Sequence, residues 1–237
     1  MEGLGEASFP LRWFSTHHIT TMKKTILTAA VCLSIVGAVS AHVIPYEVER
    51  MKDSTVFWNY LRIGYEHILP LGTDHILFIT CVFFLNTSLR KVVLQASMFT
   101  LAHSITLALA MYGIVEAPSS VIEPLIAFSI FLLAIENIAT QKVRSWRMAS
   151  VFGFGLVHGL GFASALSDLG LPSYAFAKAL ISFNIGVELG QLTIIILLYA
   201  FVARIFRTKT WYRPRIVIPI SAVIAAIALY WTVERVI

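Results

Sequence analysis

Residues 216–233 read IVIPISAVIAAIALYWTV, and none of these side chains carries a charge. An apolar helix of about 20 residues is long enough to cross the roughly 30 Å hydrocarbon core of a bilayer. The sequence therefore predicts an all-α fold, a polytopic transmembrane bundle of about six spans. The other five apolar runs have the approximate limits 58–86, 92–113, 121–140, 148–168 and 176–203.

The composition of the whole chain also indicates a membrane protein. Of the 237 residues, 58% are hydrophobic and only 13% are charged, and the mean hydropathy is +0.80, whereas soluble domains usually carry about 25% charged residues. The net charge of +5 does not indicate a nucleic-acid partner, because the basic residues cluster between apolar runs. Cys32 and Cys81 are too few for a disulfide framework or a thiolate metal cluster.

The segment 22–41, MKKTILTAAVCLSIVGAVSA, has the form of a secretory signal peptide. A positive start precedes an apolar stretch, and small residues end it at Ala41, where a signal peptidase would cut. The alternative is an uncleaved first span, although the apolar part is short for one. Residues 1–21 are then either a mis-called N-terminal extension or an unusually long front of the leader. With cleavage, residues 42–57 are interpreted as a short exterior segment and 58–237 as one six-span domain.

Basic residues in the connectors predict how the chain is oriented in the membrane. They fall in alternate connectors, while the connectors 116–120 and 167–173 hold none. Cytoplasmic loops carry an excess of Lys and Arg, so the basic connectors are expected inside the cell. The mature N-terminus is then exterior, and the expected location is the inner (cytoplasmic) membrane. The basic connector residues are Arg90, Lys91, Lys142, Arg144, Arg147, Arg204, Arg207, Lys209, Arg213 and Arg215.

Several carboxylate and amide side chains lie inside the predicted spans. A charged side chain at membrane depth costs roughly 2.5 kcal/mol or more if it faces lipid, so these groups are expected to face the interior of the bundle. Three of them, in the fifth run, are four and then three residues apart and share one helix face. The residues expected along an interior polar path are Glu136, Asn137, Asn184, Glu188 and Gln191.

Imidazoles and one carboxylate are the candidates for a metal site. The stretch YEHILPLGTDHILF, residues 65–78, contains Pro70 and Gly72, which are expected to break the first span. Nitrogen and oxygen donors without thiolates suit nickel, cobalt, zinc or copper(II). The alternative for any single polar residue is an interhelical hydrogen bond that only stabilises packing. The candidate ligands are His67, Asp74, His75, His103 and His158, with His42 as an exterior ligand beside the mature amine.

Glycines surround His158 in the stretch FGFGLVHGLGFA, residues 152–163. Gly155 and Gly159 have the small-xxx-small spacing that lets two membrane helices approach closely, and Gly161 lies two residues further on. These three glycines are therefore predicted to pack a neighbouring helix against the helix that carries His158.

The ordered motifs HILPLGTDHILF, FTLAHSITLALA, IEPLIAFSI, FGLVHGLGFA and FNIGVELGQ resemble the HupE/UreJ family of hydrogenase and urease accessory membrane proteins, in particular its second branch, over about residues 60–200. The resemblance implies a nickel or cobalt permease. It also implies that the family's metal signature falls on His67, Asp74 and His75, and on His158 with the glycine that follows it.

The first signature departs from the family pattern by one residue. Six residues separate His67 from Asp74 here, where the family has five. One added residue would rotate His67 by about 100° around an unbroken helix, and a break at Pro70 would absorb this change. The departure leaves the identity of the metal open.

These features together favour a membrane permease for a divalent transition metal, nickel or cobalt, with copper as a further candidate. The metal ion is expected as cargo or ligand, with no tightly bound cofactor. The alternative is a membrane metal-binding assembly factor that serves a metalloenzyme partner without transport. An intramembrane hydrolase is less favoured, because Ser104 follows His103 directly and their side chains point in different directions on a helix. The chain is therefore not expected to be an enzyme.

Overall fold

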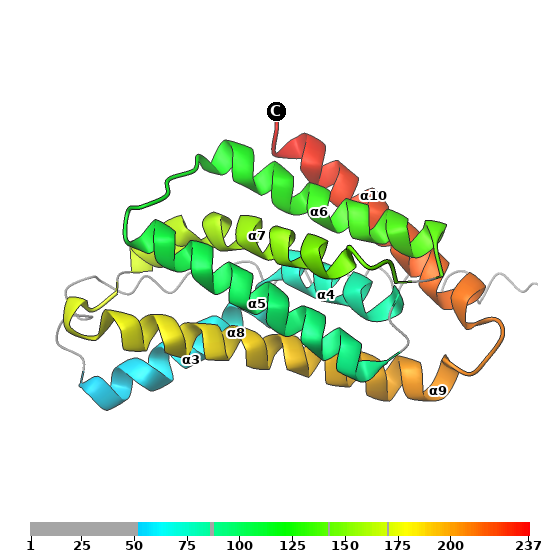
Figure 1. Cartoon of the computed structure of the whole chain (residues 1–237), viewed down its shortest axis with the longest axis horizontal. Helices are drawn as coiled ribbons and strands as arrows, with labels where there is room; N and C mark the ends of the chain where they lie inside the picture. Colours follow the sequence, from blue (N-terminus) through cyan, green and yellow to red (C-terminus); the bar gives the residue numbers. More distant parts are fainter. Residues whose placement is uncertain (1–51, 86–87, 142, 170) are drawn as a thin grey trace, which may run out of the picture. The chain divides into compact units, whose positions relative to one another are not determined.

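The computed structural model describes residues 52–85, 88–141, 143–169 and 171–237 (Figure 1). The predicted N-terminal extension, the signal peptide and His42 lie outside these residues. Within the described ranges the chain is helical and contains no strand. The prediction of an all-α fold is confirmed.

Helices follow one another with short connections (Figure 1). The helical elements are α3 (Asp53–Ile68), α4 (Thr73–Leu85), α5 (Leu89–Met111), α6 (Ser119–Ala139), α7 (Arg147–Leu169), η2 (Ser173–Ala175), α8 (Phe176–Leu198), η3 (Tyr199–Ala203), α9 (Arg204–Phe206), η4 (Arg213–Val217) and α10 (Ile218–Glu234).

Length and composition identify most of these helices as membrane spans. Among the described residues, four helical segments are long and apolar enough to cross a membrane, and α3 and α4 form a bent pair that can count as one more span. Helix α7 has 23 residues, the length of a span, and coincides with the fourth predicted run. The prediction of a multi-pass helical bundle is confirmed. The four segments are Leu89–Met111, Ser119–Ala139, Phe176–Phe206 and Arg213–Glu234.

The first span is broken between α3 and α4, which are bent by 68° relative to each other. Pro70 lacks the amide proton that a continuing helix requires. Gly72 packs tightly against the preceding turn, because a methyl group there would collide with the carbonyl oxygen of His67. The predicted break thus occurs at these two residues. It places His67 in the last turn of α3 and His75 in the first turn of α4.

The long helices pack in pairs around α4. Helix α3 packs along α8, α5 along α7, and α6 along α10, while α4 contacts α5, α6 and α8. The side chains of Phe78, Ile79 and Val82 on α4 are fully buried. At the start of α4, Thr73 is exposed and His75 is buried. This position of α4 brings His75 next to residues from the other helices.

Candidate metal centre

Three imidazoles from three helices meet at the break in the first span. His67 from α3, His75 from α4 and His103 from α5 each place one ring nitrogen within 4.8 Å of the other two. His75 is 6% exposed and His103 is fully buried. Three imidazoles this close together are a group that could hold a metal ion. The three residues therefore form a candidate metal centre, called here the histidine cluster.

A fourth imidazole and several aromatic rings enclose the histidine cluster. The ring centroid of His158, on α7, is 5.2 Å from that of His75. The ring centroid of Phe162 is 3.8 Å from that of His67, and the ring centroid of Phe99 is 5.0 Å from that of His158. Apolar walls of this kind exclude water and strengthen electrostatic interactions between the ring nitrogens and an ion.

Several ring nitrogens of the cluster are free to bind an ion. Among the described residues, the Nε2 atoms of His67 and His75 and both ring nitrogens of His103 are buried without a hydrogen-bond partner. The side chain of Asn184 lies beside His103 without hydrogen-bond geometry. A buried polar atom without a partner costs about 1–3 kcal/mol. Coordination of a metal would satisfy these nitrogens.

The remaining imidazole, His158, is held by a hydrogen bond from its ring to Ser129 on α6. The two side-chain atoms, Nε2 of His158 and Oγ of Ser129, are 3.1 Å apart, and the Ser129 hydroxyl donates its only proton to the carbonyl oxygen of Ile126 at 2.7 Å. Nε2 of His158 must therefore carry the proton and donate it to Ser129. Nδ1 of His158 is then unprotonated and carries a free lone pair. This atom is buried without a hydrogen-bond partner among the described residues.

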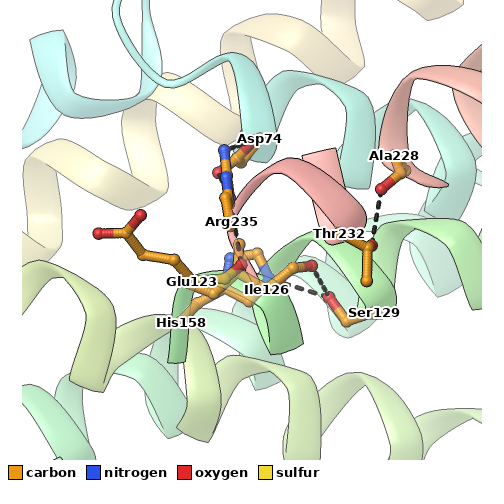
Figure 2. A network of polar contacts seen from close by, with 8 residues as sticks. All are labelled: Asp74, Glu123, Ile126, Ser129, His158, Ala228, Thr232 and Arg235. Carbon is orange, nitrogen blue, oxygen red and sulfur yellow. Dashed lines mark hydrogen bonds and ion pairs between the residues drawn. The ribbon is translucent and has the colours of Figure 1, made fainter. Parts of the chain in front are cut away.

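The carboxylate of Asp74 is engaged away from the imidazoles. Its two oxygens accept hydrogen bonds from Arg235 at 3.0 and 3.3 Å, and Figure 2 shows this pair beside His158. The group of residues whose ligand atoms lie close enough for one ion contains the three histidines of the cluster and does not contain Asp74.

A comparison with known protein families identifies the family of the chain. The family described as HupE / UreJ protein matches residues 46–235. The chain belongs to the HupE/UreJ family. Neither a curated protein nor a solved structure matches it. The long apolar helices imply a lipid bilayer as a partner, and the histidine cluster is a group that could hold a metal ion.

In this HupE/UreJ protein, glycines of α7 bring His158 against α5. A methyl group at Gly159 would collide with the carbonyl oxygen of His103 and with the hydroxyl of Thr106, and one at Gly155 would collide with the carbonyl oxygen of Phe99. Gly161 instead faces α6, where a methyl group would meet the side chain of Ile126. The three predicted packing glycines thus lie against the two helices that flank α7.

Two of the three residues predicted for a polar path on α8 line a groove between α5 and α8. The groove has a volume of about 430 Å³ and is lined by Asn184 and Glu188, among others. Oε1 of Glu188 accepts a hydrogen bond from the hydroxyl of Ser97 at 2.6 Å, while its Oε2 is buried without a partner among the described residues. Gln191 is fully buried, and neither of its amide atoms has such a partner.

At the other end of the bundle, the two predicted path residues of α6 are held by hydrogen bonds. Glu136 forms an ion pair with Arg147, which is completely buried. Arg147 also donates to the carbonyl oxygen of Cys81 at 3.2 Å, and the Asn137 amide donates to the same oxygen at 3.0 Å. Oε1 of Glu136 and Oδ1 of Asn137 are buried and without a partner in the described part of the chain.

Three residues important to this site were not singled out from the sequence. Ser129 carries no charge and resembles any other hydroxyl in a membrane helix. Arg147 belongs to a basic connector, so it was interpreted as a topology signal. Arg235 follows the last apolar run by two residues and pairs with a carboxylate 161 positions away, a separation for which the sequence pattern offers no signal.

Proposed function

We propose that this protein is a membrane permease for a divalent transition metal and that the ion passes through the histidine cluster. The observation that carries the proposal is the meeting of His67, His75 and His103, from three different helices, with buried ring nitrogens that lack partners among the described residues. Nitrogen donors of this kind suit nickel and cobalt, with copper(II) as a further candidate. The ion is the cargo, and no tightly bound cofactor is proposed.

His158 is proposed as a fourth ligand through Nδ1. Its hydrogen bond to Ser129 supports this role, because a second partner that fixes the tautomer of an imidazole is typical of metal sites. Asp74 is proposed to meet the ion before it reaches the cluster, and His42 is proposed to capture it at the mature N-terminus. The proposed cytoplasmic orientation of the basic connectors makes the Asp74 end of the bundle the exterior end.

Positions along α6 support a path from one end of the bundle to the other. Glu123, whose backbone oxygen contacts Arg235, precedes Ser129 by six residues, and Glu136 follows Ser129 by seven. With a rise of 1.5 Å per residue, Glu123 lies about 9 Å and Glu136 about 10 Å from Ser129 along the helix axis, in opposite directions. The histidine cluster is thus proposed to lie midway, with the polar side chains of α8 and the Glu136 region as the route onward.

The alternative is an assembly factor that binds the metal and delivers it to a metalloenzyme partner without transport. The histidine cluster is buried behind aromatic rings. A closed site of this kind can hold an ion without letting it pass, which favours this alternative. An intramembrane hydrolase is disfavoured, because the proton of the Ser129 hydroxyl is directed to Ile126 and not to the neighbouring imidazole.

Uptake of radioactive nickel or cobalt into proteoliposomes tests the proposal. The wild-type protein should accumulate the ion in the vesicles, and His75→Ala should abolish both accumulation and saturable binding. Cys81→Ala is the matched control, because it lies on the same helix and removes a thiol that is not part of the histidine cluster. Saturable binding without accumulation would support the assembly factor instead. Wild-type uptake by His75→Ala would refute the site.

A further inference from the structure

The C-terminal end of α10 supplies a cation to the start of α4. The Nη1 and Nη2 atoms of Arg235 donate to the two carboxylate oxygens of Asp74 at 3.0 and 3.3 Å, respectively (Figure 2). Two parallel hydrogen bonds between a guanidinium and a carboxylate are the strongest form of this contact. Both carboxylate oxygens of Asp74 therefore already accept a hydrogen bond from Arg235.

Other contacts hold Arg235 in this position without enclosing it. Its Nη1 atom also donates to the backbone oxygen of Glu123 at 3.2 Å, and its guanidinium lies 5.3 Å from the ring centroid of Trp231. The side chains of Arg235 and Asp74 remain 22% and 23% exposed. The pair is thus partly open, in contrast to Arg147, which is completely buried.

The pair also lies next to the histidine cluster. Asp74 directly precedes His75 in the first turn of α4. A divalent ion that approaches the cluster from this end meets a carboxylate whose charge is already neutralised.

We propose that Arg235 competes with the incoming metal ion for the carboxylate of Asp74 and that the two exchange during transport. The proposal rests on the proposed function of the histidine cluster. When the ion binds Asp74, Arg235 is released; when the ion moves on to the imidazoles, Arg235 returns to Asp74 and opposes its escape. Arg235 is thus a positioning residue that sets the affinity of the outer end and the direction of release.

A purely structural role for this ion pair makes the opposite prediction. If Arg235 only joined α10 to α4, its removal would loosen the start of α4 and weaken metal binding. If Arg235 competes with the ion, its removal frees Asp74 and strengthens metal binding. The sign of the change in affinity distinguishes the two roles.

Cobalt titrations and cobalt uptake test the exchange. Purified full-length wild type, R235Q, R235K, D74N and D74N/R235Q are titrated with Co²⁺ in detergent by absorption spectroscopy, and their initial uptake rates are measured in proteoliposomes. Arg235→Gln should lower the Kd for Co²⁺ by up to about fivefold, the size expected for an ion pair that is partly exposed. It should lower KM for uptake and also lower the maximal rate, because release becomes slower.

Two further variants keep the test decisive. Arg235→Lys retains the charge but loses the paired hydrogen bonds, so its Kd should fall by less than that of Arg235→Gln. In the Asp74→Asn background, Arg235→Gln should have no further effect on Kd. Arg62→Gln is the matched control, because it removes an exposed Arg–Glu pair on α3 and should leave Kd unchanged.

The proposal is overturned if R235Q and R235K both bind Co²⁺ no more tightly than the wild type, or if R235Q tightens binding equally in the D74N background. If Arg235→Gln does not fold, as judged by its thermal transition, the comparison of Arg235→Lys with wild type decides. Failure of the histidine cluster itself is recognised separately, because His75→Ala would then bind Co²⁺ as the wild type does.

Discussion

Oγ of Ser129 on α6 and Nε2 of His158 on α7 share a hydrogen bond of 3.1 Å, and we infer that the imidazole is the donor. The direction follows from the second bond of Ser129, whose hydroxyl proton goes to the carbonyl oxygen of Ile126. An uncharged residue thereby decides which nitrogen of His158 carries the proton. The consequence is a lone pair on Nδ1, the form of the ring that a metal ion requires.

Replacing Ser129 by Ala should weaken metal binding without unfolding the protein. The variant loses the acceptor for Nε2 of His158, so the ring is no longer restricted to one tautomer and orientation. Loss of such a supporting partner typically reduces metal affinity by about 10–100-fold. Equilibrium dialysis with Ni²⁺ or Co²⁺ measures the change.

Ser104→Ala is the control for this prediction. Ser104 also donates its hydroxyl to a carbonyl oxygen of its own helix, at 2.6 Å, but no imidazole hydrogen bond is among its contacts in the described structure. Its replacement should leave the affinity at the wild-type value. Equal losses in Ser129→Ala and Ser104→Ala would mean that the effect is general packing and not the tautomer of His158.

Adding a methyl group at Gly159 should force α7 away from α5. Gly159→Ala would place the new Cβ atom against the carbonyl oxygen of His103 and the hydroxyl of Thr106. Overpacking of this kind costs about 1–3 kcal/mol, and it would also displace the neighbouring His158 from the histidine cluster. Thermal unfolding in detergent and Co²⁺ binding should therefore both show a loss.

Gly153 offers a matched control on the same helix. A methyl group there would meet no atom within 4 Å, and alanine is favoured over glycine in a helix by about 1 kcal/mol. Gly153→Ala should therefore be neutral or stabilising and should bind Co²⁺ normally. A loss as large as that of Gly159→Ala would show that glycine itself, and not the close approach of α5 and α7, is required.

Removal of Arg147 should destabilise the protein strongly. Arg147→Gln leaves the carboxylate of Glu136 without its partner in a site that is nearly closed to solvent, and it removes a donor to the carbonyl oxygen of Cys81. Breaking a buried ion pair from one side typically costs about 3–5 kcal/mol. The midpoint temperature of thermal unfolding in detergent should therefore fall. Arg144 is exposed and belongs to the same predicted basic connector, so Arg144→Gln should change this temperature little. Similar transitions for both variants would refute a structural role for the buried pair.

Local patterns in the sequence predicted the helices and the break in the first span, because hydropathy and the chemistry of Pro70 and Gly72 act over a few residues. They also indicated the histidines that meet, since polar groups inside apolar runs must face protein. The partners of Asp74 and Glu136 were beyond such patterns. Arg235 and Arg147 reach these carboxylates only through the packing of α10 and α7, and neither contact leaves a periodic signal in the chain.

Glu188 provides a test of the proposed route onward from the histidine cluster. Glu188→Gln preserves the size of the side chain and its contact with Ser97, but it removes the negative charge from the groove between α5 and α8. If ions pass along this groove, the maximal uptake rate should fall by about tenfold, equivalent to about 1.4 kcal/mol in the barrier. The Kd for Co²⁺ should stay unchanged, because Glu188 is not part of the histidine cluster. Glu116→Gln is the control, because Glu116 lies in an exposed connector and its replacement should leave uptake unchanged. If Glu188→Gln takes up the ion at the wild-type rate, the route does not follow this groove.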